Sequence, residues 1–138
     1  MNRKPDWPER LMAEIARHEG ERFAWGRFDC ALFACNVVNA MTGEDPAKEF
    51  RGRYRSERGA RRALRVHGKG TLYATACHAF GRPIPPALAQ RGDVVYLDRR
   101  NGGPALGICT GGMAAFAGEG VVYRPMSDIR CAWRTGRG

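Results

Sequence analysis

The spacing of apolar residues in the first third of the chain predicts two helices of different character. Over residues 5–18, apolar side chains recur every four positions, which is typical of a helix with one apolar stripe. Residues 30–41, CALFACNVVNAM, are apolar on nearly all sides, so we expect a helix buried at the centre of the protein. Asp29 is a favourable N-cap for this second helix, and Gly43 is a favourable stop just after it.

The remaining chain changes from helical to extended patterns. Ser56 can cap a short helix over residues 57–66, and another short helix is predicted over residues 71–80. After the proline-rich residues 83–86, which cannot be helical, short apolar runs alternate with glycine-rich turns. These runs span residues 93–97, 105–110, 113–117 and 121–124. Helices followed by an antiparallel meander predict an α+β fold.

Length and composition suit one domain covering residues 1–138. Hydrophobic residues make up 43% of the chain and charged residues 27%, which is too apolar for a disordered protein. A helical half at about 5–80 and a strand half at about 92–134 follow each other without a low-complexity linker. The N-terminal MNRKPDWPER has no apolar run behind its basic residues, and no run approaches the ~18 residues of a membrane span. We therefore expect neither a signal peptide nor a membrane span.

The cysteines predict free thiols. There are five, an odd number, and no pair has the CxxC spacing of a zinc site. We therefore expect no disulfide framework, no metal and no cofactor. Four of the thiols are expected to fill the core, namely Cys35, Cys77, Cys109 and Cys131.

Cys30 occupies the position best suited to nucleophilic chemistry. It follows an aromatic–glycine loop and opens the buried helix. Unpaired backbone N–H groups and the helix dipole at such a position stabilise a thiolate and can form an oxyanion hole. Cys30 is thus a candidate nucleophile in a site shaped by Trp25, Gly26 and Asp29, and a buried structural cysteine is the alternative.

The residues around Cys30 resemble the nucleophile motif of the NlpC-type cell-wall peptidases, a papain-like cysteine peptidase superfamily. Residues 23–30 read FAWGRFDC, where the family has Tyr-x-Trp-Gly-Gly and then Asp-Cys-Ser-Gly. Residues 91–96, RGDVVY, resemble its Pro-Gly-Asp-Leu-Val-Phe strand, and residues 105–109, ALGIC, resemble its His-Val-Gly-Ile-Tyr strand. The resemblance spans about residues 23–124. It implies a nucleophile helix packed on an antiparallel sheet and a peptidoglycan peptide or amide as substrate.

The departures from this pattern concern the catalytic base. Ala105 stands where the resemblance implies the catalytic histidine. The residues where its polar partner is implied are Ala114, Ala115 and Phe116. Amide cleavage needs a base for the nucleophile and an acid for the leaving amine. We expect His18 to face solvent, His67 ends the basic segment, and His78 or a partner in trans remains as a substitute base.

The sequence also resembles a narrower group, a small phage and prophage family of unassigned function that lacks the histidine. The shared segments are FAWGRFDCALF, Gly-x-Tyr at residues 52–54, RGDVVYLD, ALGICTG and Ala-Trp-Arg at residues 132–134. Because members are encoded among tail genes, the resemblance implies a tail-tip or tail-assembly role. Such a protein is made in the host cytoplasm and joins other tail proteins in the virion.

Most of the positive charge lies in one segment. The formal net charge is +9, and residues 48–69 hold nine basic and two acidic residues, a local excess of +7. Without aromatic interleaving or a nucleic-acid motif, we expect docking on a protein or the cell envelope before nucleic acid, and a solvated helix face is the plain alternative. The candidate partner-binding residues are Arg51, Arg53, Arg55, Arg58, Arg61, Arg62 and Arg65, together with Trp133 and Arg134 at a chain end expected to be exposed.

The sequence therefore supports three alternative hypotheses for the function. The first is a non-catalytic papain-like domain acting as a structural or adaptor part of a phage tail, which the absent histidine favours. The second is an active cysteine peptidase or amidase that cleaves peptidoglycan with Cys30. The third is a nucleic-acid-contacting module that uses the arginine patch.

Overall fold

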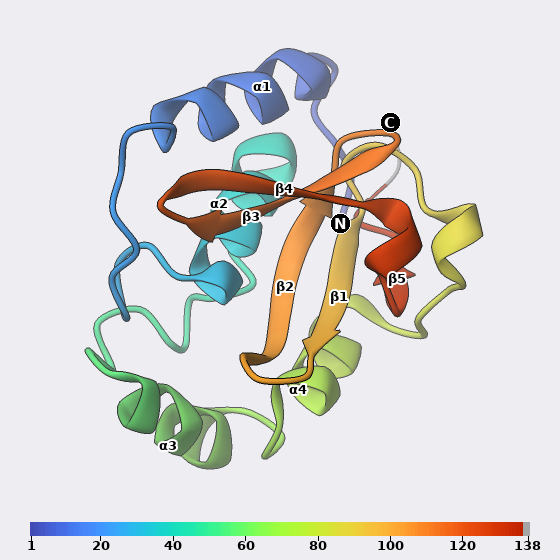
Figure 1. Ribbon diagram of the computed structural model, residues 1–138. Coiled ribbons are helices and arrows are strands. Elements are labelled where there is room, and N and C mark those ends of the chain that lie inside the picture. The colour runs from blue at the N-terminus through green and yellow to red at the C-terminus, as the bar shows by residue number, and fades with distance from the viewer. Residues whose placement is uncertain (137–138) are drawn as a thin grey trace.

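Four α-helices precede five strands in residues 1–136, the part of the chain that the computed structural model describes (Figure 1). The helices are α1 (Trp7–Arg17), α2 (Cys30–Thr42), α3 (Glu57–His67) and α4 (Leu72–Phe80). The strands are β1 (Val94–Arg99), β2 (Gly103–Cys109), β3 (Met113–Gly118), β4 (Gly120–Pro125) and β5 (Cys131–Trp133). The predicted α+β fold is confirmed. Among the described residues, no helix has the length and apolar character needed to cross a membrane.

The five strands form one antiparallel sheet in the order β4-β3-β2-β1-β5. Strands β1 to β4 follow one another as the predicted meander, and β5 returns to pair with the outer side of β1. Strands β2 and β3 pair only at Ile108–Ala115 and Cys109–Ala114. From there β3 continues to Gly118 paired with β4 but not with β2, and Ala117 in this stretch lies at the N-terminal end of α2.

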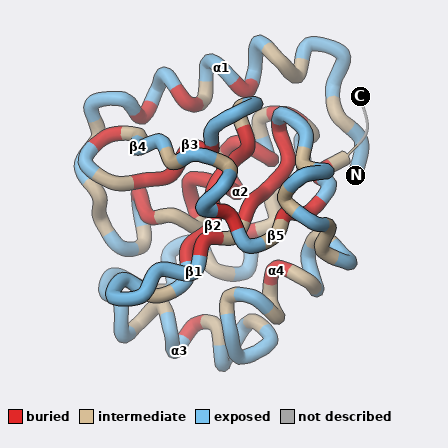
Figure 2. Tube along the Cα trace, turned by 45° about the vertical axis from the view of Figure 1, so that its right-hand side comes forward, coloured by how far each residue is buried: buried red, intermediate tan, exposed pale blue. Residues whose placement is uncertain are grey.

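Helix α2 lies at the centre of the core, as its apolar sequence predicts. Its long apolar side chains are buried against α1 and against the inner face of β2 and β3. Figure 2 shows this burial as a red band that runs through α2 and the middle strands. Asp29 caps the helix by accepting a hydrogen bond from Leu32 N, and Gly43 ends it at a left-handed φ of 83°. Both capping predictions are confirmed.

Trp133 was expected at an exposed chain end, and this prediction is wrong. The side chain is 0% exposed, because residues 131–133 form β5, in which Trp133 pairs with Val94 of β1. Its indole lies among the rings of Tyr73, Phe80 and Tyr96. The neighbouring Arg134 is exposed, so only the arginine of the expected pair reaches the surface.

His18 was expected to face solvent, and this prediction is also wrong. The residue is 4% exposed, just after the C-terminal end of α1. Its Nε2 lies 2.8 Å from a carboxylate oxygen of Glu14, and its Nδ1 lies 2.7 Å from one of Glu21. The ring stacks on Phe28 with centroids 5.0 Å apart. The two carboxylates supply the polar partners that a buried imidazole requires.

Candidate functional site

Cys30 lies in the wall of the larger of two described cavities, which has a volume of about 780 Å³. The cavity lies between the N-terminal end of α2, helices α3 and α4, and the β1–β2 turn. Trp25 and Asp29 also line it, and Gly26 stands between them in the loop before α2. The structure therefore brings together the four residues that the sequence assigned to one site.

Asp29 is the structural centre of this site. It is 1% exposed, and both carboxylate oxygens accept hydrogen bonds. One oxygen accepts from Leu32 N at 3.0 Å, and the other accepts from Gly26 N at 2.9 Å. The second oxygen also accepts from the hydroxyl of Tyr54 at 2.7 Å. Asp29 thus fixes the first turn of α2, the preceding loop and a residue 25 positions further along the chain.

Tyr54 is the site residue that sequence reasoning missed. Its only signal was the Gly-x-Tyr segment at residues 52–54, which carried no assigned role. Burial, followed by the negative charge of Asp29, raises the pKa of the Tyr54 hydroxyl, so this group stays protonated and donates. A Cβ added to Gly26, whose φ is +84°, would overlap the carbonyl oxygen of Tyr54. The glycine in the Trp-Gly pair therefore allows the close approach of the Tyr54 backbone.

The Cys30 sulfur is a protonated thiol in this setting. Its Sγ lies 3.5 Å from the carbonyl oxygen of Ala117 and donates to it. Burial raises the pKa of Cys30 to about 11, and the nearby charge of Arg99 opposes this effect only in part. Burial therefore opposes the thiolate that a position at the start of a helix favours.

The positions that the family resemblance singles out are buried in apolar clusters against which Cys30 packs. Ala105, Ala114 and Phe116 belong to one cluster and Ala115 to the other, and each of the four is at most 4% exposed. No histidine is among the described residues that line the Cys30 cavity. His67 and His78 are exposed, and His18 is held by its two glutamates. The structure therefore does not bring His78 to the cavity.

The arginine-rich segment is divided by the structure into three groups. Arg51 is engaged within the chain, with its guanidinium 2.6 Å from Asp45 and 2.7 Å from Asn36. Arg61 and Arg65, one turn apart on α3, line the Cys30 cavity. The others are exposed and outside that cavity, namely Arg53, Arg55, Arg58 and Arg62.

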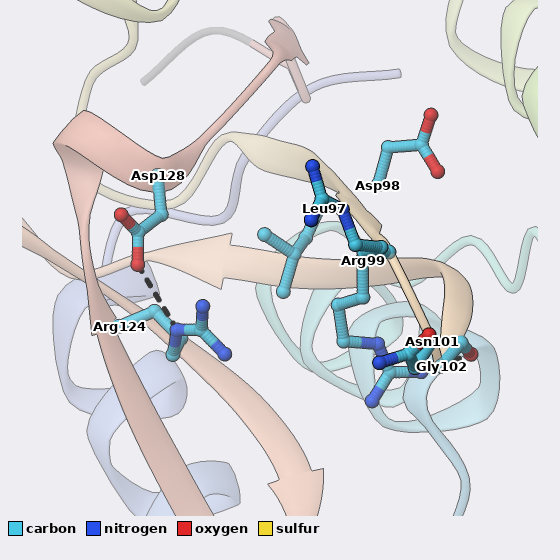
Figure 3. Close-up of a pocket in the computed structure, with 8 residues that line it drawn as sticks. Leu97, Asp98, Arg99, Asn101, Gly102, Arg124 and Asp128 are labelled. Atoms are coloured by element: carbon cyan, nitrogen blue, oxygen red, sulfur yellow. Dashed lines mark hydrogen bonds and ion pairs between the residues drawn. The ribbon is translucent and has the colours of Figure 1, made fainter.

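A second, shallower cavity of about 470 Å³ lies between the end of β1 with the β1–β2 turn and the end of β4 with the segment after it (Figure 3). Its charged side chains have both signs, and Arg124 pairs with Asp128 at 3.1 Å. Arg99 lines this cavity as well as the larger one, and its guanidinium donates to the carbonyl oxygens of Gly102 and Gly103. No cysteine, serine or threonine is among the described residues that line this cavity. Among residues 1–136, no cluster of His, Cys, Asp and Glu could hold a metal ion.

Comparison with solved structures places this architecture in the NlpC-like class. A structure described as "Crystal structure of NlpC/p60 domain of peptidoglycan hydrolase SagA" is similar with a TM-score of 0.57 and 20% sequence identity. The likeness covers 91% of this chain and 97% of that one, so it confirms the NlpC-like fold implied by the motifs. Residues 2–135 match the family described as "Domain of unknown function (DUF6950)", and the chain belongs to this family. No curated protein matches the sequence.

Proposed function

We propose that this protein is a non-hydrolytic module on a peptidoglycan-hydrolase-like scaffold, which serves as a structural or adaptor component of a phage tail. The observation that supports a non-hydrolytic module is the environment of Cys30. Its protonated thiol donates to a backbone carbonyl, packs on apolar side chains and faces a cavity whose described lining contains no histidine.

Peptide hydrolysis requires more than the cysteine. A base must take the thiol proton, and an acid must protonate the leaving amine, and these transfers typically contribute ~10²–10⁴-fold in rate. The methyl groups at Ala105, Ala114 and Ala115 and the phenyl ring at Phe116 can do neither. The competing proposal, an active cysteine peptidase or amidase, rests on the retained cysteine at the first turn of α2 and on the cavity beside it.

The adaptor role is supported by the exposed arginines outside the cavity. These are Arg53, Arg55, Arg58 and Arg62, with Arg134 at the end of the sheet. Such a surface suits an acidic face of another tail protein or the anionic cell envelope, because charge complementarity steers and orients association. Assignment to a phage tail rests on the sequence resemblance described above, from which assembly into the virion after synthesis in the host cytoplasm also follows.

The non-hydrolytic proposal predicts that purified protein releases no product from peptidoglycan fragments beyond that released by Cys30→Ser. A second experiment treats the folded protein with iodoacetamide and measures the carboxamidomethylation of Cys30 by peptide mass spectrometry. Because the pKa of Cys30 is raised to about 11, its alkylation rate at pH 8 should be roughly a hundredfold below that of Cys30 in the urea-unfolded chain. The alkylation rate of the folded protein should rise up to about pH 11. Product release that depends on Cys30 would establish the peptidase instead.

The tail assignment predicts that the protein is present in purified phage particles. Particles from an induced lysogen that encodes the chain should yield its tryptic peptides by mass spectrometry, at a constant ratio to tail proteins across a density gradient. Particles formed when the coding sequence is deleted should lack normal tails. Peptides found only in the cell lysate, with normal tails in the deletion, would argue against a tail component.

A further inference from the structure

The Cys30 cavity extends well beyond the cysteine and has a largely apolar wall. Its volume of about 780 Å³ falls within the ~300–1,000 Å³ typical of sites for small molecules. Five large apolar side chains that line it are half-buried, so they present apolar surface to the cavity. They are Phe23, Phe50, Leu64, Leu72 and Phe80. Trp25, which also lines the cavity, is 38% exposed.

The cavity also carries an excess of cations. Arg61 and Arg65 line it from α3, and Arg99 lines it from the end of β1. Figures 1 and 2 both place α3 and α4 at the end of the sheet where the β1–β2 turn lies. Arg61 is paired with Glu57 at 3.2 Å, whereas Arg65 has no ion pair or side-chain hydrogen bond within residues 1–136. Among the same residues, the hydrogen bonds that the Arg99 guanidinium donates go to neutral carbonyl oxygens.

The described residues of the cavity wall include two acidic side chains against these three arginines. They are Glu57, which pairs with Arg61, and Asp29. Both oxygens of Asp29 are already occupied by three hydrogen bonds, and the residue is buried. A compact anion would neutralise the arginines but leave the apolar wall in contact with water. A neutral apolar molecule would cover the wall but leave the arginine charges without a partner.

We propose that this cavity binds a single-chain anionic amphiphile, a molecule with one aliphatic chain that ends in a carboxylate. The chain lies against the aromatic and aliphatic wall, and Arg65 and Arg99 bind the carboxylate by charge-assisted hydrogen bonds. This function goes beyond the adaptor role, and it needs no chemistry at Cys30. Its test is therefore separable from that of hydrolysis, because Cys30→Ser should bind the same ligand.

The experiment titrates the full chain with decanoate, below its micellar concentration, by isothermal calorimetry and by tryptophan fluorescence, since Trp25 lines the cavity. Arg65→Gln should weaken binding roughly tenfold, because a hydrogen bond to a charged group is lost. Arg62→Gln is the matched control, since it removes the same charge from α3 at an exposed position outside the cavity. Decanoate should bind roughly fifteenfold more tightly than octanoate, because two more methylenes are buried.

Three outcomes would overturn the proposal. The first is no decanoate binding by the folded wild-type protein. The second is equal affinity for decanoate and the uncharged decanol, which would show that the arginines do not recognise the head group. The third is equal weakening by Arg65→Gln and Arg62→Gln, which would show adsorption to the basic surface rather than binding in the cavity. Circular dichroism confirms that each variant is folded before titration.

Discussion

Replacing Trp133 with alanine should lower the free energy of unfolding by about 3 kcal/mol. The indole is fully buried among three aromatic rings, and loss of such a side chain typically costs about 3–5 kcal/mol. The lower end applies because the indole N–H has no hydrogen-bond partner among the described residues, and removing it relieves a desolvation cost. Urea unfolding followed by circular dichroism measures the change.

Two further variants show whether packing is the cause. Trp133→Phe keeps an aromatic ring and removes the unpartnered N–H, so its cost should stay within about 1 kcal/mol. Arg134→Ala changes the adjacent exposed residue and should stay within about 0.5 kcal/mol. If Trp133→Ala were as mild as Arg134→Ala, the burial of β5 against β1 would be wrong.

The sequence predicts the parts of the fold that depend on local patterns. Helix α2 follows from an apolar run bounded by Asp29 and Gly43, and the structure has both caps. The strands from β1 to β4 follow from short apolar runs separated by glycine-rich turns. In each case neighbouring residues carry the signal, because capping and strand alternation act within a few positions.

Trp133 and His18 show where local patterns stop being informative. Strand β5 has three residues, too few for an alternating pattern, and it forms because the edge of β1 is available for pairing. His18 is polar and follows a helix, which favours exposure in isolation. Its burial depends on Glu14, Glu21 and the ring of Phe28, and only the folded chain brings these groups around it.

The basic segment at residues 48–69 shows the same limit for function. The sequence shows only that this segment is rich in positive charge, whereas the structure shows that its residues have different roles. Tyr54 reaches back to the N-cap of α2, and Arg61 and Arg65 line the cavity. The pKa of the Cys30 thiol shows the same limit. Its position at the start of a helix favours a thiolate, but burial raises its pKa. Solvation of a group depends on the whole fold, whereas the position at a helix start can be read from the sequence.

The contact between Tyr54 and Asp29 makes Asp29→Ala the second strongly destabilising change. The variant loses the N-cap of α2, worth about 1 kcal/mol, and leaves the Tyr54 hydroxyl and Gly26 N–H without their acceptor. A stranded donor costs roughly 1–3 kcal/mol, and Tyr54 is only half-buried, so the total should be about 3 kcal/mol. Urea unfolding monitored by circular dichroism again gives the value.

A double-mutant cycle separates the Tyr54 hydrogen bond from the helix cap. Tyr54→Phe alone should cost about 1–2 kcal/mol, because it removes one donor from Asp29 and leaves the Leu32 and Gly26 bonds in place. The double variant should be about 1 kcal/mol more stable than the sum of the two single changes predicts, since no hydroxyl is then stranded. Additive costs would mean that the bond contributes no stability. In that case the Gly-x-Tyr segment would be held at the site by the packing of Tyr54 on Leu32, Cys35 and Ala47 and by the close approach of its backbone to Gly26.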